Sequence, residues 1–412
     1  AGLSLEEKQA NQLQIDSILQ TVDRLADSTN FQGVKLLNGN FDFQTKNVSA
    51  AVTDFRVNGA KIAKGKTIDV QTLVTQSAQT GALYLSTNGN LNLNANSGLF
   101  TIEVGGALGS RELSFASGTT TAQIVAAINT YSDVTGVTAS AYTSGAGTNG
   151  VYLKSKDYGS DAFVSVKIVN DAGINGESGN TEVGIYGAQA SRAVRPDTAA
   201  KTLFSATGAS NGVRDVGQNL SATINGIQAT TKGRTARINT DFLDVELTLR
   251  TSDSTALGVK NAFTITGGGA EFQLASRVDI AGKVAIGIQD VSARKLGNSD
   301  VGFLSNLGNG RAFNVVDGNL ASAQKVVDEA IKQTSALRGR LGAFQRNTVG
   351  ATIRNLGVSF ENSSAAESVI RDADFATETA SLTRGQILSQ AAQNSLSLAN
   401  NQPQSALALL RG

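Results

Sequence analysis

The sequence predicts an α+β protein of several domains, in which long helices near both ends of the chain enclose a β-rich middle. Residues 3–29 and 318–400 carry apolar side chains at helical spacing, whereas residues 47–260 are rich in Gly, Thr, Ser and Asn. At 412 residues the chain can hold several hydrophobic cores. We expect the helices to form a long antiparallel rod or coiled-coil inner domain, with β-rich outer domains inserted into it.

Residues 1–46 are assigned to the N-terminal helix and turn of this rod. The apolar face of the helix is predicted to consist of Ile15, Ile18 or Leu19, Val22, and Leu25 or Ala26. The segment "NFQGVKLLNGNFDF" then ends the helix with Gly and Asn. Because "AGLSLEEKQANQ" enters in the middle of a helical pattern and lacks Met, we expect Ala1 to be a truncation point.

Two β-rich blocks are predicted next, residues 47–190 and 191–261, with a boundary near Arg192–Asp197. Short alternating segments such as "FTIEV" and "FVSVKIV" indicate strands in the first block. One helix interrupts them at residues 119–132, with Ile124, Ala127 and Ile128 on one face. In the second block Asn225-Gly226 predicts a hairpin turn.

Residues 262–365 are predicted to form a β-hairpin and a long rod helix. Apolar and small side chains recur there with an average spacing of about 3.5 residues, which is typical of a coiled coil. The positions are Leu320, Ala323, Val326, Ala330, Thr334, Leu337, Leu341, Phe344 and Thr348. A helix of about 30 residues is roughly 45 Å long.

Residues 366–412 are predicted to form a terminal coiled-coil helix with the same spacing. Its seam consists of Ile370, Ala373, Ala376, Ala380, Thr383, Ile387, Ala391, Asn394 and Leu398. Residues 362–368, "NSSAAES", are expected to cap this helix, and Pro403 to interrupt it. After Gln386 the only charged residue is Arg411, so we expect the helix to be buried by other helices, in this chain or in an assembly.

Composition excludes several kinds of site. The chain has no Cys, His, Met or Trp, so disulfides and the usual zinc, copper and haem ligands are absent, and we expect no cofactor. The net charge of +1 and the mixing of acidic and basic residues make nucleic acid an unexpected partner. No apolar run approaches the length of a membrane span, and no cleavable signal peptide is visible.

Three motifs resemble functional sites but have simpler interpretations. "GGGAE" at 267–271 lacks the Lys-Ser/Thr of a phosphate loop, so we predict a turn or bulge. In "DAGINGESGNTE", Asp171, Asn175 and Glu182 match positions 1, 5 and 12 of a calcium loop. Gly173 at position 3 offers no side-chain oxygen, so we favour a polar hairpin loop over a metal site.

The carboxylate pairs Asp372/Asp374 and Asp241/Asp244 are candidates for acid–base catalysis. Aromatic residues make up only 5% of the chain, which makes a sugar-binding cleft hard to build. We therefore predict that the protein is not an enzyme.

The terminal motifs resemble those of bacterial flagellins. The resemblance lies in "ESVIRDADFATETASLTRGQIL", with Arg-Asp-Ala-Asp at 371–374, in "NNQPQSALALLR", and in "VDRLADSTNFQGVKLLNG" at 22–39. Residues 112–142 are similar to the short Ile-Asn module shared by flagellins and hook-associated proteins. "FTITGGGAEFQL" and "VAIGIQDVSARKLG" resemble the inner-domain β-hairpin of the family.

The resemblance implies a structural subunit that assembles into an extracellular flagellar filament for motility and is exported without a cleavable signal peptide. It also implies partners: other copies of the chain, the flagellar cap, hook-associated proteins, an export chaperone and an innate immune receptor. The sequence departs from the family in lacking the N-terminal segment that pairs with the terminal helix. It also has Thr21 where many relatives carry an acidic residue in the receptor-contact region.

We expect the subunit contacts to be made by one set of side chains from the predicted helices. The set is Ile15, Val22, Leu337, Leu341, Ile370, Ala373, Ala380, Ile387, Ala391 and Leu398. The simplest alternative is that these helices only pack on each other within one chain. Two other functions stay open: a hook–filament junction protein, and a carbohydrate- or calcium-dependent surface adhesin formed by residues 47–261.

Overall fold

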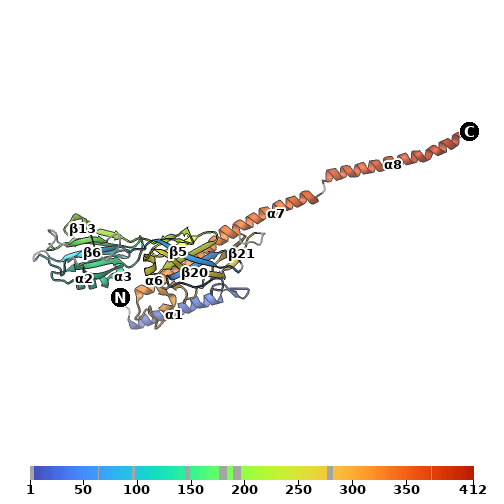
Figure 1. Cartoon of the computed structure of the whole chain (residues 1–412). Helices are drawn as coiled ribbons and strands as arrows, with labels where there is room; N and C mark the ends of the chain where they lie inside the picture. The colour runs from blue at the N-terminus through green and yellow to red at the C-terminus, as the bar shows by residue number, and fades with distance from the viewer. Residues whose placement is uncertain are drawn as a thin grey trace. The chain divides into compact units, whose positions relative to one another are not determined.

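The computed structural model describes residues 4–63, 65–94, 98–143, 149–175, 183–188, 196–275, 282–372 and 374–412. The chain divides into two compact units, Ala1–Gly339 and Arg340–Gly412. The first combines helices and β-sheets, and the second is helical (Figure 1). The predicted α+β class is confirmed.

Helix α1 (Leu5–Ser28) opens the first unit. A capping box starts it: the Glu7 backbone N–H donates to the Ser4 hydroxyl, and the Ser4 N–H donates to the Glu7 carboxylate. The buried or half-buried side chains include Gln12, Ile15, Leu19, Val22 and Ala26, which lie on one face. The two alternatives left open by the sequence therefore resolve to Leu19 and Ala26, while Ile18 and Leu25 are exposed.

Two sheets form what we call the basal module, residues 43–78 and 219–273. One sheet has the order β16 (Ile227–Gln228), β15 (Ser221–Ile224), β5 (Ile68–Gln76), β20 (Gly258–Gly268), β3 (Phe43–Lys46). The other has the order β17 (Thr230–Lys232), β18 (Thr235–Asn239), β19 (Leu243–Leu249), β4 (Val52–Ala60). Alternate residues of β19 are buried, as expected for a strand with one face on a core. The short helix α5 (Thr251–Thr255) follows β19.

The hairpin turn at Asn225-Gly226 is confirmed. Both residues have positive φ, +50° and +81°, as a type I′ turn requires, and Ile224 pairs with Ile227 across it.

Residues 79–218 form a second β module, here called the inserted module. One of its sheets has the order β13 (Pro196–Thr202), β12 (Gly184–Ala188), β6 (Ala82–Ser86), β10 (Asn149–Ser155), β9 (Val137–Thr143). The other has the order β14 (Val213–Val216), β11 (Phe163–Asn170), β7 (Phe100–Gly106), β8 (Gly109–Phe115). Three short helices accompany them, α2 (Thr121–Thr130), α3 (Ser132–Thr135) and α4 (Thr207–Asn211).

The predicted helix of the inserted module is confirmed as α2. Thr120 caps it in a capping box with Gln123, and Ile124 and Ile128 are fully buried. The helix lies against β9 and β10 (Figure 1), so its apolar face joins the core that also contains Phe100.

The two modules are nested, and the expected boundary near residue 191 is wrong. Strands β13 and β14, which follow that point, pair within the inserted module. The chain enters and leaves this module through an antiparallel bridge between Gln79 and Gln218, whose backbones exchange hydrogen bonds of 2.8 and 2.9 Å. Each module has its own hydrophobic core.

Short elements connect the basal module to the helices. They are the hairpins β1 (Asn30–Phe31) with β2 (Val34–Lys35), β21 (Ala270–Gln273) with β22 (Lys283–Ile286), and β23 (Gly297–Asn298) with β24 (Gly302–Phe303). A 3-10 turn follows at Leu304–Leu307. The β21–β22 pair confirms the hairpin expected before the long helix.

Helix α6 spans Leu320–Ala343, a π-helical turn covers Phe344–Val349, and α7 (Gly350–Arg371) continues directly from it. Helix α8 (Phe375–Leu409) begins after Asp374, whose carboxylate accepts from the Ala376 and Thr377 N–H groups.

The expected cap at residues 362–368 is wrong, because α7 runs through that segment. Ser and Asn are tolerated inside helices, and a cap needs an extended residue, which the chain supplies at Asp374. Pro403 lies inside α8 rather than ending it. Its fixed φ is the helical value, so the helix continues there with the loss of one backbone hydrogen bond.

Candidate assembly surfaces

The inner face of α6 is used within the chain's first unit. Val326, Ala330 and Leu337 are 0%, 5% and 8% exposed. Gln333 adds a polar attachment: its side-chain amide donates to the Gly297 carbonyl at 2.8 Å and accepts from the Gly297 N–H at 3.0 Å. Of the predicted contact residues, Leu337 is therefore buried by its own chain, and Leu341 is half-buried.

Helix α1 is attached to the 292–317 segment by polar side chains on its buried face. The Gln12 amide donates to the Leu307 carbonyl and accepts from the Val315 N–H, each at 2.8 Å. Asp16 accepts from the Asn309 N–H at 3.0 Å. These bonds place the predicted residues Ile15 and Val22 in half-buried positions on the same face.

Sequence reasoning missed these polar attachments. The available signal was a set of polar residues, Gln12, Asp16 and Asp23, on or beside an otherwise apolar helical face. Asp23 behaves as the others do, since it accepts from the Ala293 N–H at 2.7 Å.

A charged cluster joins α6 to the basal module. The Arg56 guanidinium of β4 lies 3.2 Å from Asp54, 3.8 Å from Glu246 and 3.2 Å from Glu329. Burial raises the pKa of Asp54 from 3.8 to about 6; Arg56 opposes this shift, and the carboxylates of Glu329 and Glu246 add to it. Burial also acts to raise the pKa of Glu329, but hydrogen bonds and charges from Gln333, Lys332 and Arg56 lower it overall.

Helix α8 presents its seam to solvent. In α8, all of which the structure describes, no side chain is buried. Ile387 and Leu398 are 63% and 67% exposed, and Ala380 and Ala391 are exposed as well. Ile370 is 84% exposed but belongs to α7, so the predicted seam is divided between two helices. Ala373 lies outside the described residues.

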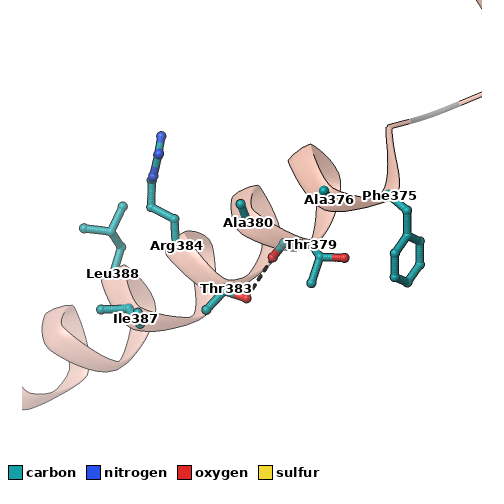
Figure 2. A pocket seen from close by; sticks show the side chains of 8 residues that line it. All are labelled: Phe375, Ala376, Thr379, Ala380, Thr383, Arg384, Ile387 and Leu388. Atoms are coloured by element: carbon teal, nitrogen blue, oxygen red, sulfur yellow. Dashed lines mark hydrogen bonds between the residues drawn. The ribbon is translucent and has the colours of Figure 1, made fainter.

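A shallow apolar groove runs along about the first four turns of α8. Figure 2 shows Phe375, Thr379, Thr383 and Ile387 along one side, and Ala376, Ala380, Arg384 and Leu388 along the other. The Thr383 hydroxyl donates to the Thr379 carbonyl at 2.7 Å, which turns its polar atom inward and its methyl group outward. The 35 residues of α8 include two charged side chains, Glu378 and Arg384. Such a helix is built for contact with other apolar surfaces.

Two family profiles match parts of the chain that these elements occupy. Residues 324–410 match the bacterial flagellin C-terminal helical region, which covers most of α6 together with α7 and α8. Residues 100–157 match the flagellin hook IN motif, which covers β7 to β10 with α2 and α3. Both regions of the chain are therefore similar to bacterial flagellins.

Curated flagellins show the same relationship. A flagellin of Bacillus subtilis (strain 168) is 38% identical over 169 residues, covering 40% of this chain and 54% of the relative. Flagellin A of Helicobacter pylori is 27% identical over 99% of this chain and 80% of its own length. The chain spans about half the length of the Bacillus subtilis relatives that it matches.

Among solved structures, the D2-D3 domains of the flagellar cap protein FliD from Escherichia coli align with a TM-score of 0.33. The identity is 16%, over 55% of this chain and 98% of that chain.

The calcium-loop candidate gains no support from the described residues. Asp171 accepts from the Gly173 N–H at 3.3 Å within its own loop, and the Asn175 amide donates to Asn92 at 3.1 Å, which joins two loops distant in sequence. Glu182 lies outside the described residues. Within the described ranges, no group of three or more acidic side chains is arranged to hold a metal ion.

The other candidate motifs also have structural roles in this chain. Asp241 is paired with Lys61 at 2.8 Å, and Asp244 with Arg237 at 3.1 Å. Asp372 accepts a hydrogen bond from Ser368, and Asp374 caps α8. In the "GGGAE" segment β20 ends at Gly268 and β21 begins at Ala270, so Gly269 alone forms the bend between them; Gly267, Gly268 and Gly269 all have positive φ. Among the helices of the described part, none combines the length and apolar character needed to cross a membrane.

Proposed function

We propose that this chain is a structural subunit of an extracellular bacterial flagellar filament, joined to other copies through α7 and α8. The observation that carries the proposal is a 35-residue helix, α8, with two charged side chains and an unburied apolar seam, in a region that matches the flagellin C-terminal helices. Burying one Leu or Ile side chain contributes about 1.5–3 kcal/mol, so a seam with several of them favours association strongly.

The proposed mechanism is open, head-to-tail repetition. A contact between two different surfaces of identical subunits generates a helical filament when the rotation does not close a ring. The seam residues Ala380, Ile387, Ala391 and Leu398 would form one such surface. Small residues among them permit the close approach of a neighbouring helix, and neutral Gln and Asn side chains avoid repulsion between stacked copies.

The flagellar cap, the hook-associated proteins and an export chaperone are proposed as further partners, on the basis of the similarity to flagellins. Each would contact the same terminal helices or the filament end. An innate immune receptor is a proposed partner for residues around Gln14–Asp23 of α1.

A polymerisation assay with matched variants tests the proposal. The chain, alone and extended at its N-terminus by the corresponding segment of the Bacillus subtilis flagellin, is exposed to precipitating salt and examined by sedimentation and electron microscopy. We expect filaments from the extended chain. Ile387→Asp should reduce the sedimenting fraction at least about tenfold, because a charge in the seam costs several kcal/mol when buried.

Leu257→Asp is the control, since Leu257 lies in the basal module and is 64% exposed, nearly the same as Ile387 at 63%. This variant should assemble as the parent does. Filaments of normal length from the Ile387→Asp variant would contradict the role of α8, and an extended parent chain that stays monomeric would contradict the filament function.

A further inference from the structure

One arginine lies among three carboxylates where α6 meets the basal module. Arg56 and Asp54 come from β4, Glu246 from β19 and Glu329 from α6. Their side chains are 17%, 27%, 32% and 15% exposed, in that order, so water screens their charges only partly. The contact between a helix and a sheet therefore includes ionised groups at the edge of an apolar surface.

Strand register explains why these groups meet. Asp54 and Arg56 are two residues apart, so both project from the same face of the sheet. Arg56 pairs directly with Glu246 on β19, and Asp54 pairs with Thr248. Helix α6 supplies Glu329, which lies between the buried positions Val326 and Ala330. The guanidinium is the single positive group that all three carboxylates approach within 4 Å in the described structure.

Other charged groups surround the cluster from each neighbouring element. Lys332 of α6 lies 3.4 Å from Glu329, and Arg237 of β18 is occupied by Asp244. Two cavities, of about 340 and 520 Å³, are both lined by Asp54 and Arg56. The other ionisable groups lining these cavities are Asp42, Asp290 and Lys295 in the first, and Asp157, Tyr158, Asp161, Lys232, Glu246, Glu329 and Lys332 in the second.

We propose that the attachment of α6 to the basal module is proton-linked, and that proton uptake by Asp54 tightens it. When Asp54 is ionised, it competes with Glu329 and Glu246 for the Arg56 guanidinium and repels both of them. When Asp54 is protonated, it no longer repels Glu329 and Glu246, and the Arg56 guanidinium pairs with these two carboxylates alone. The bond from β4 to α6 is then stronger.

The direction of the pH dependence follows from linkage. The pKa of Asp54 is raised by burial to about 6, above its ordinary 3.8, so the attached state binds a proton that the detached state does not bind between these values. Stability of the attachment therefore increases as pH falls from above 6 toward 4. Glu329, whose pKa is lowered, acts in the opposite direction only below its ordinary value of 4.5.

Amide hydrogen exchange of α6 in the full chain, measured between pH 7.5 and pH 5 and corrected for intrinsic rates, tests the proposal. Opening of residues 320–339 should be about tenfold rarer at pH 5 than at pH 7.5. Asp54→Asn should remove this difference and give strong protection at both pH values. Glu329→Gln should weaken protection at pH 7.5, because Arg56 loses its helical partner.

Asp241→Asn is the matched control, because Asp241 is an exposed carboxylate paired with Lys61 elsewhere in the same sheet region. It should keep the wild-type pH dependence. The proposal is overturned if protection of α6 in the parent chain does not change between pH 7.5 and pH 5. It is equally overturned if Asp54→Asn retains the full pH dependence.

Discussion

Gln12 shows how one polar side chain can fix a long helix. It is 3% exposed, and both ends of its amide are hydrogen-bonded to backbone groups of the 292–317 segment. The two partners, Leu307 and Val315, are about three hundred residues away along the chain, so the bonds require the 292–317 segment to lie beside α1. A buried polar group in this position specifies where α1 lies.

Replacing Gln12 by Leu should destabilise the first unit by about 2–4 kcal/mol, because a buried carbonyl and a buried N–H each lose their partner. The measurement is the midpoint of urea unfolding, followed by circular dichroism. Gln14→Leu is the control, since Gln14 is exposed on the same helix. A Gln12→Leu variant as stable as the Gln14→Leu variant would show that the amide is not required.

The π-helical turn between α6 and α7 changes which side chains share a face. A π turn holds about one extra residue, so positions after it are displaced by about one residue along the helix face. If the spacing of three or four residues is continued from Phe344 without the extra residue of the π turn, the same helix face carries four polar residues, Thr348, Thr352, Asn355 and Ser359. With the shift the face carries Val349, Ile353, Leu356 and Phe360. The turn therefore extends the apolar stripe into α7.

Because the π-helical turn holds one extra residue, deleting one residue there and inserting one residue there should have different effects on the apolar stripe. Deleting Thr348 should convert the π turn to a regular α-helical turn, with the apolar residues of α7 still in phase. Inserting one Ala after Thr348 should rotate those residues by about 100° relative to Phe344. Under the proposed function, filament assembly should survive the deletion and be strongly reduced by the insertion, as measured by sedimentation. Loss of assembly in the deletion variant alone would contradict the assigned register.

At the scale of the whole molecule, the insertion of one module into the other gives the chain two separate hydrophobic cores. The basal and inserted modules have distinct cores, and a two-residue bridge at Gln79 and Gln218 marks the crossing points of the chain. The basal module brings together strands from residues 43–76 and 221–268, whereas the inserted module is continuous in sequence.

Replacing residues 80–217 by Asn-Gly should leave the basal module folded, because this dipeptide forms the turn that an antiparallel pair needs. We expect a cooperative thermal transition and unchanged hydrogen-exchange protection of β4, β5, β19 and β20. As a control, the same dipeptide replaces residues 192–217, which removes β13, α4 and β14 from the inserted module and should destabilise it. Unfolding of the basal strands in the first variant would contradict the independence of the two cores.

Local signals made part of this architecture predictable. The cap and apolar face of α2 lie within a dozen residues, and Asn225-Gly226 determines its own turn, so both were recognised from sequence. The pairing of Gln79 with Gln218 could not be recognised from the sequence, because no pattern near either residue indicates the other. Neither could the partners of Gln12. The "NSSAAES" segment was misread because Ser and Asn favour caps without requiring them. The partner of α8 lies beyond any single chain under the proposed function, so its seam stays a prediction.

The bridge at Gln79 and Gln218 also has a mechanical consequence. A force on the inserted module passes to the basal module through two adjacent strands of backbone and through side-chain contacts such as Asn219 with Ser160 and Lys232 with Asp161. The path of the chain below the bridge is the same whatever lies beyond it. Under the proposed function, a subunit of this design can carry an outer part of a different size while its assembly surfaces on α7 and α8 stay unchanged.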